Sequence, residues 1–544
     1  MIIDARNLPQ GETVNCDVCI VGAGAAGITL ACELRDKGMQ VVLLESGGMK
    51  FEKEIQDLNK GVVVDSKVHG TLEEYRRRYL GGATTAWGGR CVPFDEIDFE
   101  PRSYVPYSGW PFTKRDLDPY YERAHAYCEI GPYTYEVKDV LPHSVRNQLM
   151  ISGFASEDVS VDKLYLFSPP TDFGKVYIDS LKNSANIKVF IYANCASIGC
   201  EREANQVSHL NVVTPRKNEF RVNAKQYILA GGGLEVTRLL LLSNDTYSQG
   251  IGNHSDLLGR FYMCHMQNHI ELKFKVPIVG DYEKNAEGTY CLRAIEVKEE
   301  KQRQYQLLNS RGFMERPDFT DPSHGNGVLS AAYLAKNFLS RQKTYKDLGG
   351  HLKNIVFDLG GVLLFSPKWL NERILSERKL PSVQLKSKAN IYTIRIDFEQ
   401  APNPESRLTL SESKDAFGFN RLKADWKYTD LDVESATKTT ELIGKAIVKS
   451  GTGEVRRISK LEPRGNGGHH IGTTRMASDP SSGVVDENCL VHGLSNLYIA
   501  SSSVFPTCGY ANPTLTIVAI AIRLGDYIKR LYGSCNKNLW DASN

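Results

Sequence analysis

The hydrophobic pattern from Asp17 to Gly47 changes its period three times. An apolar run is followed by a glycine-rich turn, then by a helical pattern with small inward residues, then by a second apolar run. This order predicts a strand, a helix and a second strand, which together form a βαβ unit. Gly22, Gly24 and Gly27 form a G-x-G-x-x-G motif between the first strand and the helix. The motif predicts dinucleotide binding, because its glycines let the backbone approach a pyrophosphate at the positive helix N-terminus.

Further segments extend the same predicted domain. Glu45 ends the second strand, where its carboxylate is placed to accept hydrogen bonds from an adenosine ribose. A strand-rich stretch at 187–200 leads to an apolar strand at 224–229, and Ala230 then opens a glycine turn before another helix. The chain returns to strand, loop and amphipathic helix after 461. We therefore expect the nucleotide domain to be built from both ends of the chain.

The middle of the chain has a different pattern. Alternating residues at 391–400 and 407–410 predict strands, and 433–448 predicts a helix. We expect an α/β protein, with a Rossmann-like cofactor-binding domain and a second, substrate-binding domain built on an antiparallel sheet with helices. The expected boundaries are 1–105, 185–270 and 461–544 for the discontinuous cofactor-binding domain, and 106–184 and 271–460 for the substrate-binding domain and insertions.

Two short strings resemble sites of other kinds. Cys16 and Cys19 form a C-x-x-C, but no second pair follows and Cys19 lies in an apolar run. Because a structural zinc site needs four ligands, we expect core packing and no metal. The string NIVFDLGGVLL places Asp358 after an apolar run, as in haloacid-dehalogenase-type phosphatases, but lacks the second aspartate two places on. We interpret it as a buried strand followed by a glycine turn.

The amino-acid composition bears on which partners the protein binds and which cellular compartment it occupies. The 66 Lys and Arg residues nearly cancel the 64 Asp and Glu residues, so we expect neither a nucleic-acid nor a membrane partner. We see no secretory signal at the N-terminus and no apolar stretch long enough to cross a bilayer. The 12 cysteines have no repeating spacing, which predicts reduced thiols and a cytoplasmic location.

Several motifs occur in one order along most of the chain. They are the GAGAAG turn with Glu45, LGGATTAWGG from Leu80, AGGGLEVTRLLLLSN, EQAPNPESRLTL from Glu399, HHIGTTRM and YANPTLT. Together they resemble the glucose-methanol-choline (GMC) oxidoreductase family, and the C-terminal portion is most similar to pyranose oxidase and bacterial sugar oxidases. The resemblance implies an FAD-dependent enzyme that oxidises CH-OH groups.

The resemblance also implies a set of site residues. His469 opens the H-x-x-G-T segment and Asn512 lies near the C-terminus, so both are expected to face the flavin as catalytic residues. Trp87 would lie against the isoalloxazine and Thr514 near its pyrimidine end, whereas Ser501 stands where many members carry an aspartate. The complete implied cofactor site is Gly22, Gly24, Ala25, Ala26, Gly27, Glu45, Gly81, Gly82, Thr85, Trp87, Ala230, Ser501, Asn512 and Thr514.

One departure from the family bears on how FAD is held. Pyranose oxidases attach FAD through a histidine immediately before the tryptophan that corresponds to Trp87, and this chain has Ala86 there. The resemblance therefore implies non-covalent FAD, and a link through Cys91 is not expected.

The chemistry needs a base, because an isolated hydroxyl holds its proton tightly, near the roughly 15.7 pKa of water. A neutral imidazole suits this role, so His469 is the expected base. Asn512 can donate an amide N–H to the same oxygen as charge develops. Only one of His469 and His470 is expected to face the flavin, because adjacent residues on an extended segment point opposite ways. Thr473, Thr474 and Arg475 fit loop scaffolding as well as a site.

Several functional alternatives stay open at this stage. The favoured substrate is a sugar, glycoside or polyol, and a tailoring alcohol oxidase in natural-product biosynthesis fits nearly as well. A non-redox lyase of the same family and a non-enzymatic flavin-binding protein are the rival classes. The electron acceptor is either oxygen or another molecule, and the chain contains no C-x-x-C-H haem-attachment motif. An oligomer is possible, and no recognition residue can be named between Lys301 and Asp347.

Overall fold

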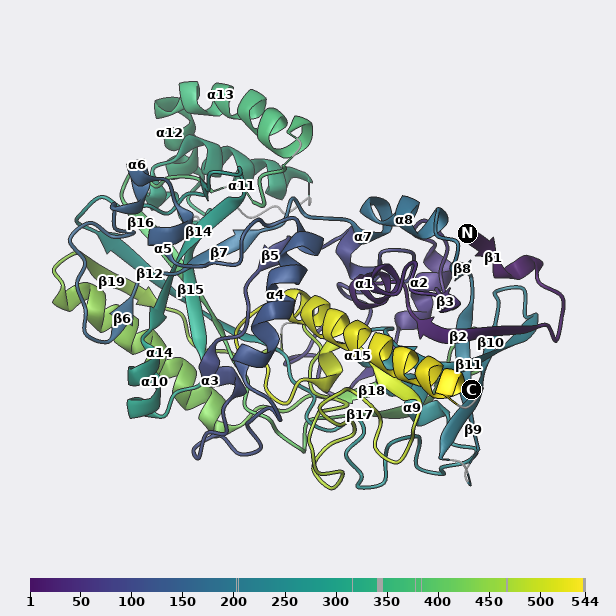
Figure 1. Cartoon of the computed structure of the whole chain (residues 1–544). Helices are drawn as coiled ribbons and strands as arrows, with labels where there is room; N and C mark the ends of the chain where they lie inside the picture. Colours follow the sequence, from purple (N-terminus) through teal and green to yellow (C-terminus); the bar gives the residue numbers. More distant parts are fainter. Residues whose placement is uncertain are drawn as a thin grey trace.

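The computed structural model describes residues 1–544 except 202, 204, 316, 340–345, 377, 383, 466–467 and 542–544. Two large sheets lie side by side, and a group of helices stands apart at one end (Figure 1). The sheet on the right of Figure 1 carries the glycine turn, and the sheet on the left is antiparallel.

The first sheet has a parallel centre with an antiparallel edge. Its order is β1-β8-β3-β2-β11-β10-β9, and β20 pairs in parallel with the end of β11. The strands are β1 (Ile2–Asp4), β2 (Thr13–Val21), β3 (Val41–Leu44), β8 (Ile187–Ile191), β9 (Asn194–Glu201), β10 (Gln206–Val213), β11 (Glu219–Leu229) and β20 (Leu497–Ile499). The glycine turn joins β2 to α1 (Ala25–Glu33), and a second turn joins β11 to α9 (Gly233–Leu242). Both predicted strand-turn-helix units are confirmed, and Cys19 is fully buried in β2.

The second sheet is antiparallel, as predicted. Its order is β19-β12-β16-β15-β14-β7-β5, and β6 and β13 both pair with β14. The strands are β5 (Arg90–Cys91), β6 (Val159–Ser160), β7 (Leu164–Phe167), β12 (Met266–Phe274), β13 (Glu283–Lys284), β14 (Tyr290–Val297), β15 (Ser310–Glu315), β16 (Ile391–Phe398) and β19 (Gly453–Ile458). Helix α14 (Asp430–Lys449) starts at a Thr429–Asp432 capping box and packs on this sheet. Its Ile443 and Ile447 join Ile270 in a buried cluster.

The remaining elements connect the two sheets. Strands β4 (Val62–Val63), β17 (Arg407–Lys414) and β18 (Asn420–Asp425) form a small third sheet, and β17 and β18 contact α9. Helix α4 (Lys114–Cys128) packs along α15 (Thr514–Asp541), the yellow helix of Figure 1. Both α4 and β17–β18 come from ranges expected in the substrate-binding domain, yet they contact elements of the nucleotide-binding part. The domain boundaries therefore stay a prediction. The short helices are α2 (Lys53–Gln56), α3 (Glu96–Phe99), α5 (Val137–Val140), α6 (His143–Arg146), α7 (Phe173–Val176), α8 (Ile178–Lys182) and α10 (Glu299–Tyr305).

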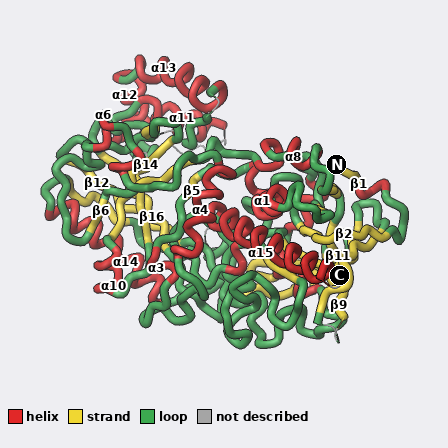
Figure 2. Tube along the Cα trace, in the orientation of Figure 1, coloured by secondary structure: helices red, strands yellow, loops and turns green. Residues whose placement is uncertain are grey.

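The prediction of a buried strand around Asp358 is wrong. The segment forms two consecutive helices, α12 (Leu348–Phe357) and α13 (Leu359–Leu370), which pack on α11 (Gly327–Leu339) (Figure 2). A short apolar run does not by itself distinguish a strand from a helix. Among the described residues no single helix has the length and apolar composition to cross a membrane, but α12 and the first half of α13 meet that criterion together, with a bend of 79°.

Candidate active site

The glycine turn after β2 has two glycines that the fold requires. Gly22 has a φ of +104°, and a Cβ there would lie 2.7 Å from the Ala230 carbonyl oxygen. A Cβ on Gly27 would lie 1.8 Å from the Gly22 carbonyl oxygen. These two positions therefore need glycine so that α1 and β11 can approach the turn closely.

Gly24 is different, because its own position is open. A Cβ added there meets no atom within 4 Å, and no side chain caps the N-terminus of α1, which Gly24 precedes. Unpaired N–H groups and the positive end of the helix dipole favour a bound anion. The open space beside Gly24 fits the pyrophosphate of a dinucleotide, with Ala25 and Ala26 in the first turn of α1.

A second loop and Glu45 brace this turn. The Gly81 N–H donates to the Ala23 carbonyl at 2.8 Å, and a Cβ on Gly82 would lie 3.0 Å from the Gly24 Cα. Glu45 is buried, and its two carboxylate oxygens accept the N–H groups of Ala23 at 3.0 Å and Gly47 at 2.9 Å. Burial raises the Glu45 pKa, although these hydrogen bonds oppose the rise. Glu45 thus holds the turn, and its contact with a ribose stays a prediction.

The other expected cofactor residues lie on nearby segments. The Ala500 N–H donates to the Leu229 carbonyl at the end of β11, which places Ser501 beside Ala230. The Ser501 hydroxyl accepts the Ser503 N–H at 3.0 Å. The Thr85 hydroxyl donates to the Gly82 carbonyl, the Trp87 indole donates to the Thr171 carbonyl, and Thr514 begins α15. Direct contact of these side chains with the cofactor stays a prediction.

The structure brings the two expected catalytic residues into contact. Asn512 Nδ2 lies 3.0 Å from His469 Nε2, and His469 Nδ1 lies 2.8 Å from His265 Nδ1. Arg90 Nε donates to Asn512 Oδ1 at 2.5 Å, and its terminal nitrogen donates to Asp397 at 2.7 Å. Five side chains from separate parts of the sequence therefore form one hydrogen-bonded chain.

The direction of each hydrogen bond in this chain follows from Arg90, which can only donate. Its bond identifies the Asn512 atom facing it as oxygen, so the Asn512 amide nitrogen faces His469 Nε2. His469 Nε2 is then an acceptor with a lone pair, and the ring carries its proton on Nδ1. That proton is donated to His265 Nδ1, and His265 Nε2 donates in turn to the Cys508 carbonyl at 3.3 Å. The pattern selects the tautomer that a general base at Nε2 requires.

Burial keeps both histidines neutral. It lowers the His469 pKa well below its usual value, and the neighbouring His265 and Arg90 lower it further. Burial also lowers the His265 pKa to about 4. Burial alone would raise the Asp397 pKa, but Arg90 and Arg395 outweigh it and lower the pKa to about 2. The site thus contains a neutral imidazole pair next to an ionised Arg–Asp pair.

His470 points to other partners. Its Nδ1 lies 2.7 Å from the Tyr262 hydroxyl, which lies 2.9 Å from His69 Nε2. Potential metal-ligand atoms of His69, Cys264 and His470 lie within 4.8 Å of one another. The Tyr262 hydroxyl bridges the two imidazoles through His470 Nδ1 and His69 Nε2, while His470 Nε2 is buried without a hydrogen-bond partner among the described residues. Thr473, Thr474 and Arg475 also contact neighbouring protein groups.

Sequence reasoning missed His265, Arg90 and Asp397. Arg90 lies on β5, His265 immediately precedes β12, and Asp397 lies on β16. The pairing of β12 with β16 places Met266 opposite Phe398, which brings His265 and Asp397 to the same end of the sheet. No local motif marks these positions, because only the tertiary structure brings them together: strand pairing for His265 and Asp397, and side-chain hydrogen bonds for Arg90.

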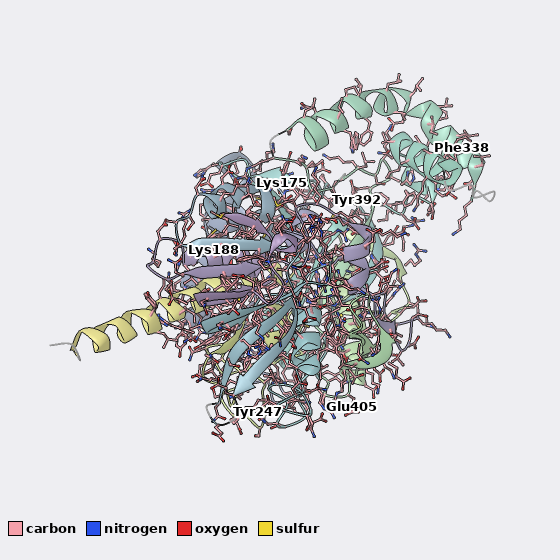
Figure 3. The ribbon with its side chains drawn as sticks, turned by 90° about the vertical axis from the view of Figure 1, so that its right-hand side faces the viewer. Lys175, Lys188, Tyr247, Phe338, Tyr392 and Glu405 are labelled. Atoms are coloured by element: carbon pink, nitrogen blue, oxygen red, sulfur yellow. The ribbon has the colours of Figure 1, made fainter. Side chains whose placement is uncertain are left out.

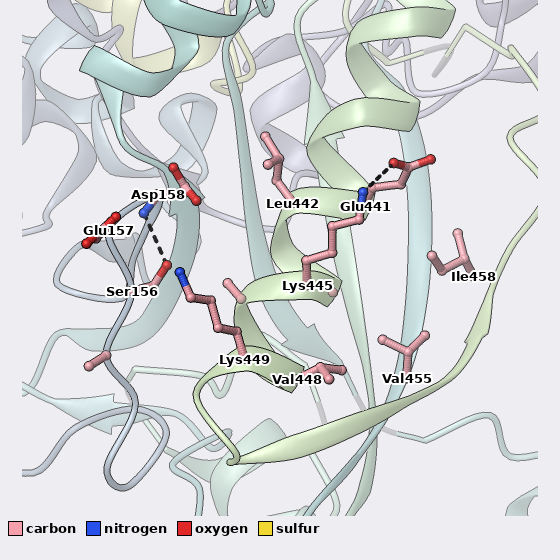
Figure 4. Close-up of a pocket in the computed structure, with 13 residues that line it drawn as sticks. Ser156, Glu157, Asp158, Glu441, Leu442, Lys445, Val448, Lys449, Val455 and Ile458 are labelled. Carbon is pink, nitrogen blue, oxygen red and sulfur yellow. Dashed lines mark hydrogen bonds and ion pairs between the residues drawn. The ribbon is translucent and has the colours of Figure 1, made fainter.

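Surface grooves lie elsewhere. One of about 970 Å³ runs between α14, β19 and residues 155–158 (Figure 4), and another of about 530 Å³ lies near Tyr305 and Leu431. Neither is lined by His469 or Asn512. The candidate site is therefore located by its chemistry and not by these hollows.

We call the open space beside Gly24 at the N-terminus of α1 the glycine cradle. This cradle, together with a buried neutral histidine beside an amide donor, defines the class as a dinucleotide-dependent oxidoreductase. A family model described as GMC oxidoreductase matches residues 402–521, and one described as NAD(P)-binding Rossmann-like domain matches residues 20–77. The C-terminal segment thus matches the GMC oxidoreductase family model, and the glycine-turn segment matches the Rossmann-like model.

Individual relatives cover nearly the whole chain. The fructose dehydrogenase large subunit of Gluconobacter japonicus is 23% identical over 95% of this chain and 98% of its own. The paromamine 6'-oxidase of Streptomyces fradiae is 22% identical over 94% of this chain and 92% of its own. A fungal aryl-alcohol oxidase structure is 12% identical, with a TM-score of 0.56 over 96% of this chain and 100% of that one. The relatives support an FAD-dependent enzyme acting on CH-OH groups.

Proposed function

We propose that this protein oxidises a ring hydroxyl of a sugar or glycoside, with FAD bound non-covalently at the glycine cradle. The observation that carries the proposal is the lone pair on His469 Nε2, held beside the Asn512 amide. The names of relatives favour the substrate class, since they include a fructose dehydrogenase and a C-glycoside 3-oxidase. Bound FAD supplies the acceptor for the hydride that leaves the carbon.

The residues of this chain then do the proton chemistry. His469 Nε2 takes the hydroxyl proton as general base. The Asn512 amide N–H turns to the same oxygen and stabilises the charge that develops there. Arg90 keeps the Asn512 carbonyl occupied, so the amide continues to present its donor to the reacting oxygen. The imidazole needs no prior deprotonation near neutral pH, because its pKa is already low.

Two positions support non-covalent FAD. Ala86 has no nucleophilic side chain. Cys91 follows Arg90 on β5, and adjacent strand residues point to opposite faces. Because Arg90 contacts Asn512, Cys91 faces away from the catalytic pair, and it is buried. Denaturing the purified protein with acid should therefore release all of its FAD into the supernatant.

We further propose a cytoplasmic enzyme that passes its electrons to oxygen or to a separate acceptor. None of the 11 cysteines whose side chains are described forms a disulfide, which supports a reducing compartment. Assembly into an oligomer remains part of the proposal, to be measured by light scattering.

The test is reduction of the bound flavin without oxygen. Glucose, fructose, simple glycosides and other alcohols are added anaerobically, and loss of the oxidised-flavin absorbance is followed. We expect one substrate class to bleach the flavin. In the His469→Ala and Asn512→Ala variants, the rate of bleaching should be lower by a factor of about 100 or more. His143→Ala, which changes an exposed histidine, is the matched control. Bound flavin that no alcohol reduces would favour a lyase, and absence of flavin would overturn the proposal.

A tailoring oxidase that acts on a natural-product precursor is the second candidate. The names of two relatives, paromamine 6'-oxidase and 6'''-hydroxyparomomycin C oxidase, favour it. Including paromamine beside glucose in the anaerobic panel separates the two candidates, because only the better substrate reduces the flavin rapidly at low concentration.

A further inference from the structure

Helices α12 and α13 expose an unusual run of large apolar side chains. Of the 23 exposed large apolar residues among those described, 11 lie between Phe338 and Leu375. The helices project from the body of the molecule, and Phe338 lies on this projection in Figure 3. Single exposed apolar residues are common on soluble proteins, but large contiguous apolar patches mark sites that bind a partner or a membrane. The six residues that define the apolar face of this projection are Leu352, Val356, Phe357, Leu359, Leu363 and Leu364, which are 49–79% exposed.

The side of α12 that faces the protein is polar instead. His351 is buried, and its Nδ1 lies 3.0 Å from the Ser330 hydroxyl. Asn354 donates to the Pro322 carbonyl at 2.8 Å. Asp358, at the break before α13, accepts the Gly327 N–H at 2.9 Å and pairs with Lys388 at 2.7 Å.

This arrangement reverses the usual amphipathic helix. On a helix in water the apolar stripe faces the core and polar residues face the solvent. Here His351, Asn354 and Asp358 recur at helical spacing toward the protein, while the apolar face points outward. The pair is anchored by its polar side, so its apolar face is free for an apolar environment.

The charges around the apolar face indicate the kind of environment. Between Leu348 and Phe365 the chain has two charged residues, Lys353 and Asp358. Asp358 is already paired with Lys388, and Lys353 is exposed beside the Phe357 ring, 5.9 Å from its centre. Lys336, Lys346 and Lys379, which precede or follow the two helices, are also exposed, as is Asp347 at the start of α12. Lys386 and Lys388 are exposed too, but they are paired with Asp281 and Asp358. An apolar face with a basic surround suits anionic lipid headgroups.

A protein partner fits this surface less well. Protein interfaces carry roughly one hydrogen bond per 100–200 Å², with a polar rim. The six side chains of the apolar face offer no donor or acceptor, whereas hydrocarbon requires none. Trp369, partly exposed near the end of α13, is of the type enriched at membrane interfaces.

The length and bend of the pair favour lying in the membrane surface. Eighteen helical residues span about 27 Å when straight, short of the roughly 30 Å hydrocarbon core. The 79° bend shortens this reach further. We propose that α12 and α13 insert their apolar face into one leaflet of an anionic bilayer, which makes this enzyme a peripheral membrane protein. This proposal is independent of the substrate and replaces the expectation, from overall charge, that no membrane is bound.

The test uses the full-length, FAD-loaded protein and vesicles of phosphatidylcholine with one quarter phosphatidylglycerol. We expect the protein to float with these vesicles in a density gradient, and to bind neutral phosphatidylcholine vesicles more weakly. The double variant F357S/L364S should bind about 100-fold more weakly, because it removes two inserted side chains. The control double variant F51S/V448S changes two other exposed apolar residues, 55% and 53% exposed, and should bind as wild type does. Flavin content and oxidation of soluble substrate are measured on both, to show that each variant is folded.

Two results would overturn the proposal. One is a wild-type protein that stays at the bottom of the gradient with anionic vesicles. The other is a wild-type dimer in light scattering that becomes a monomer in F357S/L364S while neither protein binds vesicles, which would assign the apolar face to a second copy. Equal binding to neutral and anionic vesicles would overturn the role of the basic surround. Loss of alcohol oxidation with intact vesicle binding would count against the proposed function alone.

Discussion

His469 is held at both ring nitrogens, and neither bond is made by a neighbour in the sequence. Asn512, which lies in the segment before α15, is hydrogen-bonded to Nε2. His265, which immediately precedes β12, is hydrogen-bonded to Nδ1. Because Arg90 fixes the Asn512 amide, the identity of each donor and acceptor is determined along the whole chain. His265 is therefore a positioning residue, which holds the proton of His469 on the nitrogen away from the substrate.

Replacing His265 with alanine tests this role. The acceptor for the Nδ1 proton is lost, so we expect kcat to fall about 10–100-fold with a smaller change in KM. Burial is the main cause of the low His469 pKa, and below about pH 4, where His265 is itself protonated, repulsion from His265 adds to it, so removal of His265 raises that pKa. His469 is active only when neutral, so the acid limb of the kcat/KM profile should move to higher pH. The measurement is a steady-state pH profile.

Two further variants separate positioning from general damage. His265→Asn keeps an acceptor and should recover part of kcat. His125→Ala removes another buried histidine, bonded to the Gly131 carbonyl and Tyr135, and should leave the pH profile in place. An unshifted acid limb in His265→Ala would contradict the proposed role.

At the scale of elements, the β2–α1 turn shows that its glycines serve different purposes. A side chain on Gly27 collides with the backbone of Gly22, whereas a side chain on Gly24 enters open space. The φ of Gly24 is −89°, which any residue can adopt. The fold therefore requires glycine at 27 but not at 24, where we propose that the bound cofactor requires it.

The matched variants Gly24→Ala and Gly27→Ala test this distinction. Gly24→Ala should leave the melting temperature of the FAD-free protein nearly unchanged and weaken FAD binding by about ten-fold or more, because the methyl group occupies the pyrophosphate space. Gly27→Ala should destabilise the FAD-free protein by about 2 kcal/mol or more, because backbone must move. Thermal melts and FAD titrations measure both. Equal losses of stability in the two variants would contradict the assignment.

At the scale of the whole molecule, burial of neutral histidines sets the response to acid. Burial lowers the pKa of His125 and of His265 to about 4, against about 6.5 in an unfolded chain. Below pH 6.5 the unfolded state binds protons that the folded state does not, so stability falls as the pH drops from 6.5 toward 4. Asp432 acts in the opposite direction, because burial raises its pKa to about 6.

The free energy of unfolding should therefore decrease between pH 7 and pH 4.5, with about 3 kcal/mol from each fully buried histidine and a similar opposing amount from Asp432. His125→Gln removes one of these contributions, and its unfolding free energy should depend less steeply on pH. Denaturant unfolding at several pH values measures this. Parallel pH curves for wild type and variant would show that His125 is not the source.

The sequence by itself determined the elements whose chemistry is local. Strand, glycine turn and helix follow one another from Thr13 to Glu33, so their periods and the G-x-G-x-x-G spacing predict the nucleotide-binding turn. His469 and Asn512 were found through family motifs, and the structure places their side chains in contact. The apolar run before Asp358 was misassigned, because its hydrophobicity alone does not choose between a buried strand and an exposed helix.

Only the tertiary structure decided which distant residues complete the site. Arg90, His265 and Asp397 are separated by more than a hundred residues from one another. The pairing of β12 with β16 brings His265 and Asp397 together, and Arg90 reaches Asp397 through its side chain from β5 at the other edge of the sheet. The direction of every hydrogen bond through His469 depends on the contact of Arg90 with Asn512. Which side of α12 faces the protein was likewise settled by packing, because its polar residues find partners in α11 and the Pro322 loop while Leu352, Val356 and Phe357 stay exposed.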